Sequence, residues 1–316
     1  MKKFFIMGMA AMGLALTACN NDETVEVAKG NAIGFSSFVD KSTRGATDVT
    51  IDNLENIEVY GWRGDKLIFN AQQVNAKTGV YSPLLYWEAG NTYNFEAIAP
   101  NNGEKGVTFA AAKTGGEITF VNNAETDLLY AKATERTAVK ATEAPEKVSF
   151  TLNHQLARVK FTFKNTFPET AAAKITVKNV KITNAYKNGT ITPAAENATW
   201  TATDQTLAVN FAGNITNLAA GGGAAATDHM YLIPTAKEES YIVTFLVTLD
   251  QNGAITDYTH SVTVKTTQKQ GMSYNYIAEI NEKNVNPDPN VQLFPIVFTT
   301  TVSDWADFAD QPKILK

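Results

Sequence analysis

Apolar residues along this chain recur at every second position far more often than at the helical spacing of three and four. The clearest examples of this alternation are KVSFTL (147–152), RVKFTF (158–163), TLAVNF (206–211) and YIVTFLVTL (241–249). Alternation puts apolar side chains on one face and polar side chains on the other, as in a half-buried antiparallel strand. No segment has the pattern of a long amphipathic helix, so the sequence predicts an all-β protein.

Turn residues and chain length indicate how the strands are grouped. Asn252-Gly253 separates two alternating runs, which is a strong signal for a β-hairpin. Without its first 18 residues the chain of 316 has 298 left, enough for two domains with separate cores. The polar stretch 132–147 is the best candidate for the boundary, giving domains at 45–140 and 141–316. The same stretch also fits a long loop inside one domain.

The N-terminus has the pattern of a secretory signal peptide over residues 1–18. Lys2 and Lys3 precede an apolar run that is too short for a stable membrane-spanning helix. The run ends in LTAC, which resembles the lipidation site of bacterial lipoproteins, so we expect a lipid on Cys19. Cys19 is the only cysteine, and an intramolecular disulfide is therefore excluded. Lipid would be the only attachment of the precursor to the outer membrane.

Composition and charge argue against several classes of function. The whole chain has 27 basic and 32 acidic residues; removing the two lysines of the signal leaves 25 against 32, a net charge of −7. An acidic chain without basic clusters is not expected to bind nucleic acid. With three histidines and one cysteine destined for lipid, we expect no enzyme activity, no metal and no cofactor. His154 lies between two alternating runs, where a packed histidine is the more common case.

The segment NAIGFSSFVDKSTRGATDV (31–49) joins a strand pattern to a loop of small polar residues. Ile33, Phe35 and Val39 share the apolar face of the predicted strand, and Arg44 follows in the loop, next to Gly45. Small residues of this kind suit proteolysis. Among the other arginines, Arg136 is the competing exposed position.

Several blocks of sequence together resemble the fimbrillin family of type V pilins. They are YWEAGNTYNFEAIAP (86–100), DLLYAKA (127–133), VSFTLNHQLARVKFTF (148–163), MYLIP (230–234), GMSYNYIAEI (271–280) and TTTVSDWADF (299–308). Their order and approximate spacing match the family over nearly the whole mature chain. The resemblance implies two transthyretin-like Greek-key β-sandwich domains in tandem, export as a lipoprotein, and assembly into surface fimbriae by strand exchange with other fimbrial subunits.

The resemblance also implies a sequence of processing steps. An arginine-specific protease of the outer membrane would cut after Arg44, and the segment 19–44 would leave with the lipid and the first strand. The loss of a strand exposes an apolar groove and unpaired backbone groups, which a strand from another subunit can cover. The protein would then leave the outer membrane for an extracellular fimbrium.

The expected donor strand lies in VQLFPIVFTTTV (291–302). Its apolar face consists of Phe294, Ile296, Phe298 and Val302. Burying four such side chains contributes roughly 6–12 kcal/mol before ordering costs. The alternative is that this segment is simply the last strand of the C-terminal domain.

The resemblance favours a stalk subunit, because anchor subunits lack the cleavage arginine and tip subunits tend to lack a donor C-terminus. An anchor or tip subunit is an alternative. Another is a surface lipoprotein that never polymerises and binds glycans through exposed aromatic rings such as Trp62, Trp87 or Trp200. Tryptophans beside alternating strands are more often core residues.

Overall fold

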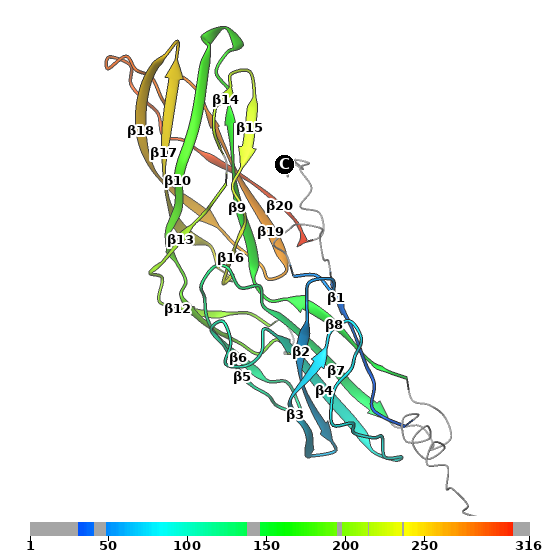
Figure 1. Ribbon diagram of the computed structural model, residues 1–316. Coiled ribbons are helices and arrows are strands. Elements are labelled where there is room, and N and C mark those ends of the chain that lie inside the picture. The colour runs from blue at the N-terminus through cyan, green and yellow to red at the C-terminus, as the bar shows by residue number, and fades with distance from the viewer. Residues whose placement is uncertain are drawn as a thin grey trace, which may run out of the picture.

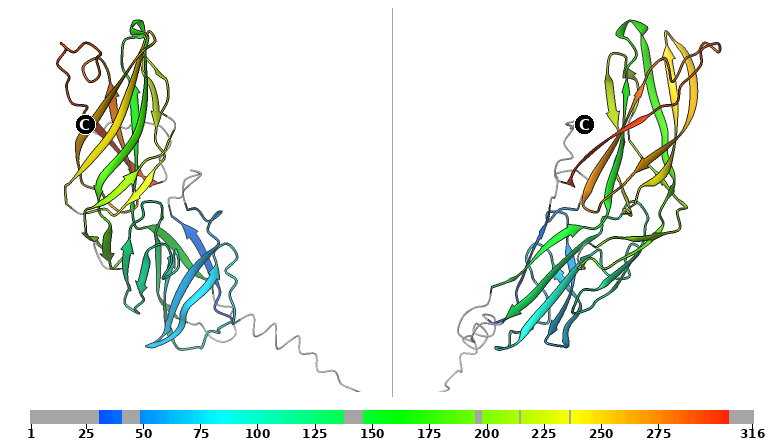
Figure 2. Two further views of the ribbon diagram at one scale, coloured as in Figure 1. Left: turned by 60° about the vertical axis from the view of Figure 1, so that its left-hand side comes forward. Right: turned by 180° about the vertical axis from the view of Figure 1, so that it is seen from behind.

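The computed structural model describes residues 31–40, 49–137, 146–194, 198–213, 215–235 and 237–305, which form two β-rich lobes arranged end to end (Figures 1 and 2). Strands dominate the described residues, and their one helix is the short 3₁₀ turn Glu169–Ala171. The all-β prediction is confirmed. No helix of the described part is long and apolar enough to cross a membrane.

The lower lobe in Figure 1 contains a six-stranded sheet and a four-stranded sheet. In spatial order, the six-stranded sheet consists of β1 (Phe35–Val39), β8 (Val148–His154), β7 (Leu129–Thr137), β4 (Thr92–Ala99), β2 (Asn56–Arg63) and β3 (Lys66–Asn75). The four-stranded sheet consists of β12 (Thr201–Thr203), β11 (Asn188–Ile191), β6 (Glu117–Val121) and β5 (Val107–Ala110).

The upper lobe is a sandwich of two further sheets. One consists of β13 (Leu207–Asn210), β10 (Ala173–Ala185), β17 (Glu239–Gln251) and β18 (Ala254–Thr266), with β14 (Leu218–Ala219) also paired to β10. The other consists of β15 (Gly223–Ala226), β9 (Ala157–Asn165), β19 (Met272–Ile280) and β20 (Phe298–Asp304), with β16 (Met230–Leu232) also paired to β9.

The alternating runs of the sequence form strands of this fold. The inward side chains of β9, β17 and β19 fill one large apolar core between the two sheets of the upper lobe. The expected hairpin joins β17 to β18, with Gln251 opposite Ala254. Asn252 and Gly253 both have positive φ, +54° and +83°, as a two-residue hairpin turn requires.

The expected domain boundary at residues 140/141 does not coincide with a boundary between sheets. That boundary falls between β7 and β8, which pair through Leu129–His154 and Tyr130–Asn153. Residues 132–137 of the polar stretch belong to β7, and β8 begins at Val148, so this stretch joins two strands of one sheet, the alternative that the sequence left open. The chain passes to the upper lobe after β8, where β9 begins at Ala157.

The lower lobe also takes two strands from the second half of the chain. β11 pairs with β6, with Gly189 opposite Phe120, and β12 pairs with β11. Ile191 and Trp200 join the apolar cluster on that face of the six-stranded sheet. The hairpin of β5 and β6 is too narrow to cover this face, so the returning chain completes its burial.

Candidate functional site

The first strand occupies an edge of the six-stranded sheet, where it pairs with one named strand. β1 runs parallel to β8, in a register from Phe35–Val148 to Val39–Leu152 (Figure 1). The amide of Val148 donates to the Gly34 carbonyl at one end, and the amide of Asp40 donates to the Leu152 carbonyl at the other, both at 2.8 Å.

The other edge of β1 is covered by a loop, residues 76–87, which we call the clasp. The Ile33 amide donates to the Leu85 carbonyl, and the Trp87 amide donates to the Asn31 carbonyl. The Tyr81 hydroxyl, buried, donates to the Ile33 carbonyl at 2.7 Å. β1 and the residues just before it thus pair with β8 on one side and contact the clasp on the other. The clasp does not form a full ladder of hydrogen bonds with β1.

Side chains of β1 and of the residue Ile33 before it point inward and fill an apolar site. Ile33, just before β1, and Phe35 and Val39 within it are 0%, 1% and 8% exposed, so all three side chains are buried. Phe35 sits in a cage of four aromatic rings with centroids 5.3–5.8 Å from its own: Phe69, Tyr81, Phe95 and Phe150.

The remaining inward position of β1 is polar. Ser37 is 7% exposed, and its hydroxyl donates to the carbonyl of Ala76 in the clasp at 2.6 Å. A buried carbonyl left without a donor costs about 1–3 kcal/mol, so this position selects for a hydroxyl. Ser37 could not be predicted as a site residue from the sequence, because a serine in an alternating run normally indicates a break in the apolar face. Tyr81 and Ala76 were missed because they lie in a loop without periodicity.

The structure describes only some of the residues considered as processing sites. Cys19, Arg44 and Gly45 lie outside the described residues. Arg136 is exposed but belongs to β7, where it stands opposite Tyr93. A protease needs an extended unpaired chain, so the pairing of Arg136 disfavours it as a cleavage site. Arg158 is 1% exposed and would become accessible only on unfolding.

The expected donor segment belongs, in this structure, to its own upper lobe. β20 pairs antiparallel with β19, from Ala278–Phe298 to Met272–Asp304. Ile296 is buried, and Phe298 and Val302 pack against the large core. Phe294 differs from the expectation of one shared face, because it precedes β20 and is 55% exposed.

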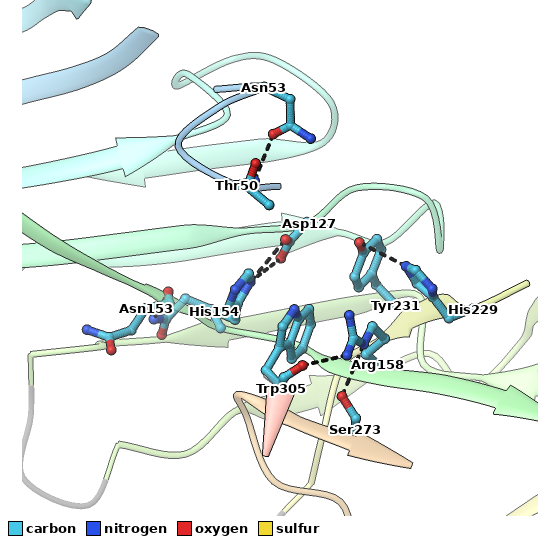
Figure 3. A network of polar contacts seen from close by, with 11 residues as sticks. Thr50, Asn53, Asp127, Asn153, His154, Arg158, His229, Tyr231, Ser273 and Trp305 are labelled. Atoms are coloured by element: carbon cyan, nitrogen blue, oxygen red, sulfur yellow. Dashed lines mark hydrogen bonds and ion pairs between the residues drawn. The ribbon is translucent and has the colours of Figure 1, made fainter. Parts of the chain in front are cut away.

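β20 ends at Asp304, and the next residue, Trp305, lies among buried polar side chains at the junction of the lobes (Figure 3). The Trp305 ring stacks on His154, with centroids 4.1 Å apart, and the Trp305 carbonyl accepts a hydrogen bond from Arg158 at 2.6 Å. His154 Nδ1 lies 3.0 Å from Asp127. His154 is therefore a packed, partnered histidine at the end of β8, as expected from its sequence context.

The tryptophans proposed as glycan platforms do not form an open aromatic surface. Trp62 and Trp200 are 8% and 6% exposed and pack in the lower lobe. The Trp200 indole also donates to the Gln155 carbonyl. Trp87 is partly buried, with its ring edge-on to Tyr93. These placements remove the feature on which the glycan alternative rested.

One comparison with known proteins identifies a family. A family model described as fimbrillin-like matches residues 43–305. A search of curated proteins gives no match.

Three similar solved structures have low sequence identity. A putative cell adhesion protein from Bacteroides uniformis is 16% identical, with 87% of this chain and 98% of that chain covered and a TM-score of 0.54. A second, from Bacteroides ovatus, is 17% identical, covers 87% and 97%, and has a TM-score of 0.48. The fimbrial anchor protein Mfa2 from Porphyromonas gingivalis is 10% identical, covers 87% and 97%, and has a TM-score of 0.36. At these identities the first likeness shows a shared fold.

Proposed function

Because the chain belongs to the fimbrillin-like family, we propose that it is a stalk subunit of a surface fimbrium, in which the C-terminal strand of one copy replaces β1 of the next. The precursor carries lipid on Cys19 at the outer membrane. An arginine-specific protease cuts it between Arg44 and Gly45, and β1 then leaves with the lipid.

The observation that carries this proposal is a match between the two strands. The inward positions of the first strand are Ile33, Phe35, Ser37 and Val39, and the same spacing in the C-terminal segment gives Ile296, Phe298, Thr300 and Val302. The four pairs agree in chemistry at every position, including the hydroxyl. In this register Phe298 enters the aromatic cage, and Thr300 reaches the Ala76 carbonyl in place of Ser37.

Backbone bonding in the clasp supports the same register. Pro295, which has no amide hydrogen, takes the place of Ala32. The antiparallel bridge between Ala32 and Tyr86 is made through the amides of Ile33 and Trp87, so it requires no donor at position 32. Ile296 then supplies the amide that Ile33 supplies in the precursor.

Shifts of the donor by two or by four residues fit less well. With Ile296 in the place of Phe35, Phe298 would take the place of Ser37 and meet the Ala76 carbonyl. With Phe294 in the place of Phe35, Gln292 would replace the fully buried Ile33. Either shift buries a polar group without its partner, or an apolar group against a carbonyl.

Disulfide trapping tests both the function and the register. In the proposed register Thr301 takes the place of Phe38, which lies opposite Thr151 of β8. Processing removes Cys19, so a chain with Thr151→Cys and Thr301→Cys has two cysteines, and oxidation should link neighbouring copies into ladders. The matched control, Thr151→Cys with Thr299→Cys, should link much less, because Thr299 takes the place of Ser36.

Each outcome has a separate meaning. Stronger linkage through Thr299 would overturn the register. Polymers without either linkage would overturn the donor strand, and the absence of polymers after cleavage would overturn the function. Mature surface protein that still carries residues 20–44 would exclude the stalk assignment.

A further inference from the structure

Trp305 is buried far more deeply than the strand that it follows. β20 is mostly half-exposed, whereas Trp305 is 0% exposed and belongs to the apolar cluster of the lower lobe. Its ring stacks on His154 at 4.1 Å with an interplanar angle of 13°, and on Tyr231 at 5.7 Å and 6°. The end of an upper-lobe strand is thus fixed in the core of the other lobe.

Arg158 is hydrogen-bonded to the backbone of Trp305. Its Nη2 donates to the Trp305 carbonyl at 2.6 Å, its Nε donates to Ser273 Oγ at 3.0 Å, and Cζ lies 4.9 Å from the centre of the Trp305 ring (Figure 3). Arg158 is 1% exposed, and hydrogen bonds made by a buried charge are costly to lose. β20 therefore has a strong hold at its C-terminal end in addition to its ladder with β19.

His154 connects this hold to the site of β1. Five of the seven residues of β8 pair with β1, and the last two, Asn153 and His154, pair with β7. β8, the strand that pairs with β1, therefore ends at His154, the residue on which Trp305 stacks. The imidazole of His154 is oriented by the contact of its Nδ1 with the Asp127 carboxylate.

We propose that Trp305 is a latch that keeps β20 in its own sheet while β1 is in place, and that the departure of β1 releases it. Without β1, the ladder of β8 is reduced to the pairing of Asn153 and His154 with β7, so His154 supports the Trp305 ring from the end of a strand that has lost most of its partners. The coupling between the two strands is a property of the single chain. Its use, the release of a donor strand, rests on the proposed function.

The latch gives assembly an order. A precursor with β1 in place holds its donor strand and cannot add to a fibre. A processed subunit has an empty groove and a released donor, so it can donate to the empty groove at the end of a growing fibre. A subunit whose groove is filled before it has donated is locked again, because the new strand restores the support of β8.

Hydrogen exchange of the unprocessed full-length chain tests the coupling without any assembly. Phe35→Ala weakens β1 and should raise the exchange rates of the amides of β20 by about tenfold, because coupling of two sites typically amounts to 5–150-fold. Val59→Ala is the matched control, since it removes a buried side chain from the same core but lies on β2. It should leave exchange in β20 nearly unchanged. If Phe35→Ala prevents folding, Phe35→Leu serves as the milder change.

The reciprocal variants give a second, independent readout. Coupling between two sites acts equally in both directions, so Trp305→Ala should raise exchange in β1, and Trp305→Phe should restore most of the protection by keeping a ring on His154. Unchanged exchange in β20 with both Phe35 variants, or an equal rise with Val59→Ala, would overturn the latch. Coupled exchange in a chain that never polymerises would leave the latch intact and overturn the proposed function.

Discussion

The ring of Phe35 stacks on the ring of Phe150, with centroids 5.8 Å apart and planes inclined by 14°. Phe150 lies on β8, and Phe69, Tyr81 and Phe95 close the remaining sides of the cage from β3, the clasp and β4. Four of these five rings lie outside β1, so they would stay in the chain if processing removed that strand.

Phe35→Ala should lower the free energy of unfolding by about 3–5 kcal/mol, because it empties a fully packed aromatic site. Phe38→Ala is the control on the same strand, since Phe38 is 59% exposed, and its effect should stay within about 0.5 kcal/mol. Urea denaturation of the unprocessed chain measures both. Equal effects of the two variants would mean that the cage does not hold β1.

Gly79→Ala should loosen β1 from the clasp side. Gly79 has φ +73°, and a Cβ at this position would overlap the Phe35 carbonyl oxygen. Gly90 has a similar φ, +79°, but open space around it, so Gly90→Ala isolates the cost of backbone strain. We expect losses of about 2–4 kcal/mol for Gly79→Ala and about 1 kcal/mol for Gly90→Ala in thermal unfolding. Similar losses would show that the clasp can move away without cost.

Thr300→Val should weaken the joint between subunits while Thr301→Val does not. In the proposed register the Thr300 hydroxyl satisfies the Ala76 carbonyl, and Thr301 faces outward in the place of Phe38. Loss of that hydrogen bond costs about 1–2 kcal/mol, or roughly tenfold in affinity. A fluorescent peptide of residues 291–305 titrated onto the processed protein measures the difference, and equal affinities of the two variant peptides would contradict the register.

His260 should give the upper lobe a pH dependence. Burial against Phe245 lowers the pKa of His260 below its ordinary 6.5, so the unfolded chain takes up a proton more readily than the folded chain. The stabilisation is present above pH 6.5 and is lost as the pH falls through the range below it. Between pH 7.5 and 5.5 the wild type should lose up to about 1 kcal/mol more than His260→Gln in urea denaturation. Identical losses would show that this histidine titrates normally in the fold.

Periodicity predicted the strands well because the two faces of each strand meet different surroundings. The residues Tyr241, Val243 and Phe245 point into the large core, while their neighbours on β17 face outward. The hairpin at Asn252-Gly253 was predictable for a local reason, because both residues tolerate positive φ. These features depend on nearest neighbours in the sequence.

Other features depend on distant pairing and left no periodic signal. β11 returns to the lower lobe because Ile191 and Trp200 complete a core begun by Phe109 and Phe120, some 70 residues earlier or more. The contacts of Trp305 with His154 and Arg158 likewise join segments 147 residues apart or more. The sequence could indicate that Trp305 ends a strand, but not which lobe would bury it.

The parallel course of β1 and β8 along the long axis of the molecule has a mechanical consequence (Figure 1). In the proposed fibre, a strand that replaces β1 in this direction would be bonded to its neighbour by hydrogen bonds that lie across the long axis of the subunit. Tension along this axis would load these hydrogen bonds in shear and all together, and would not break them one at a time. A fimbrium built in this way would resist flow with the combined strength of each ladder.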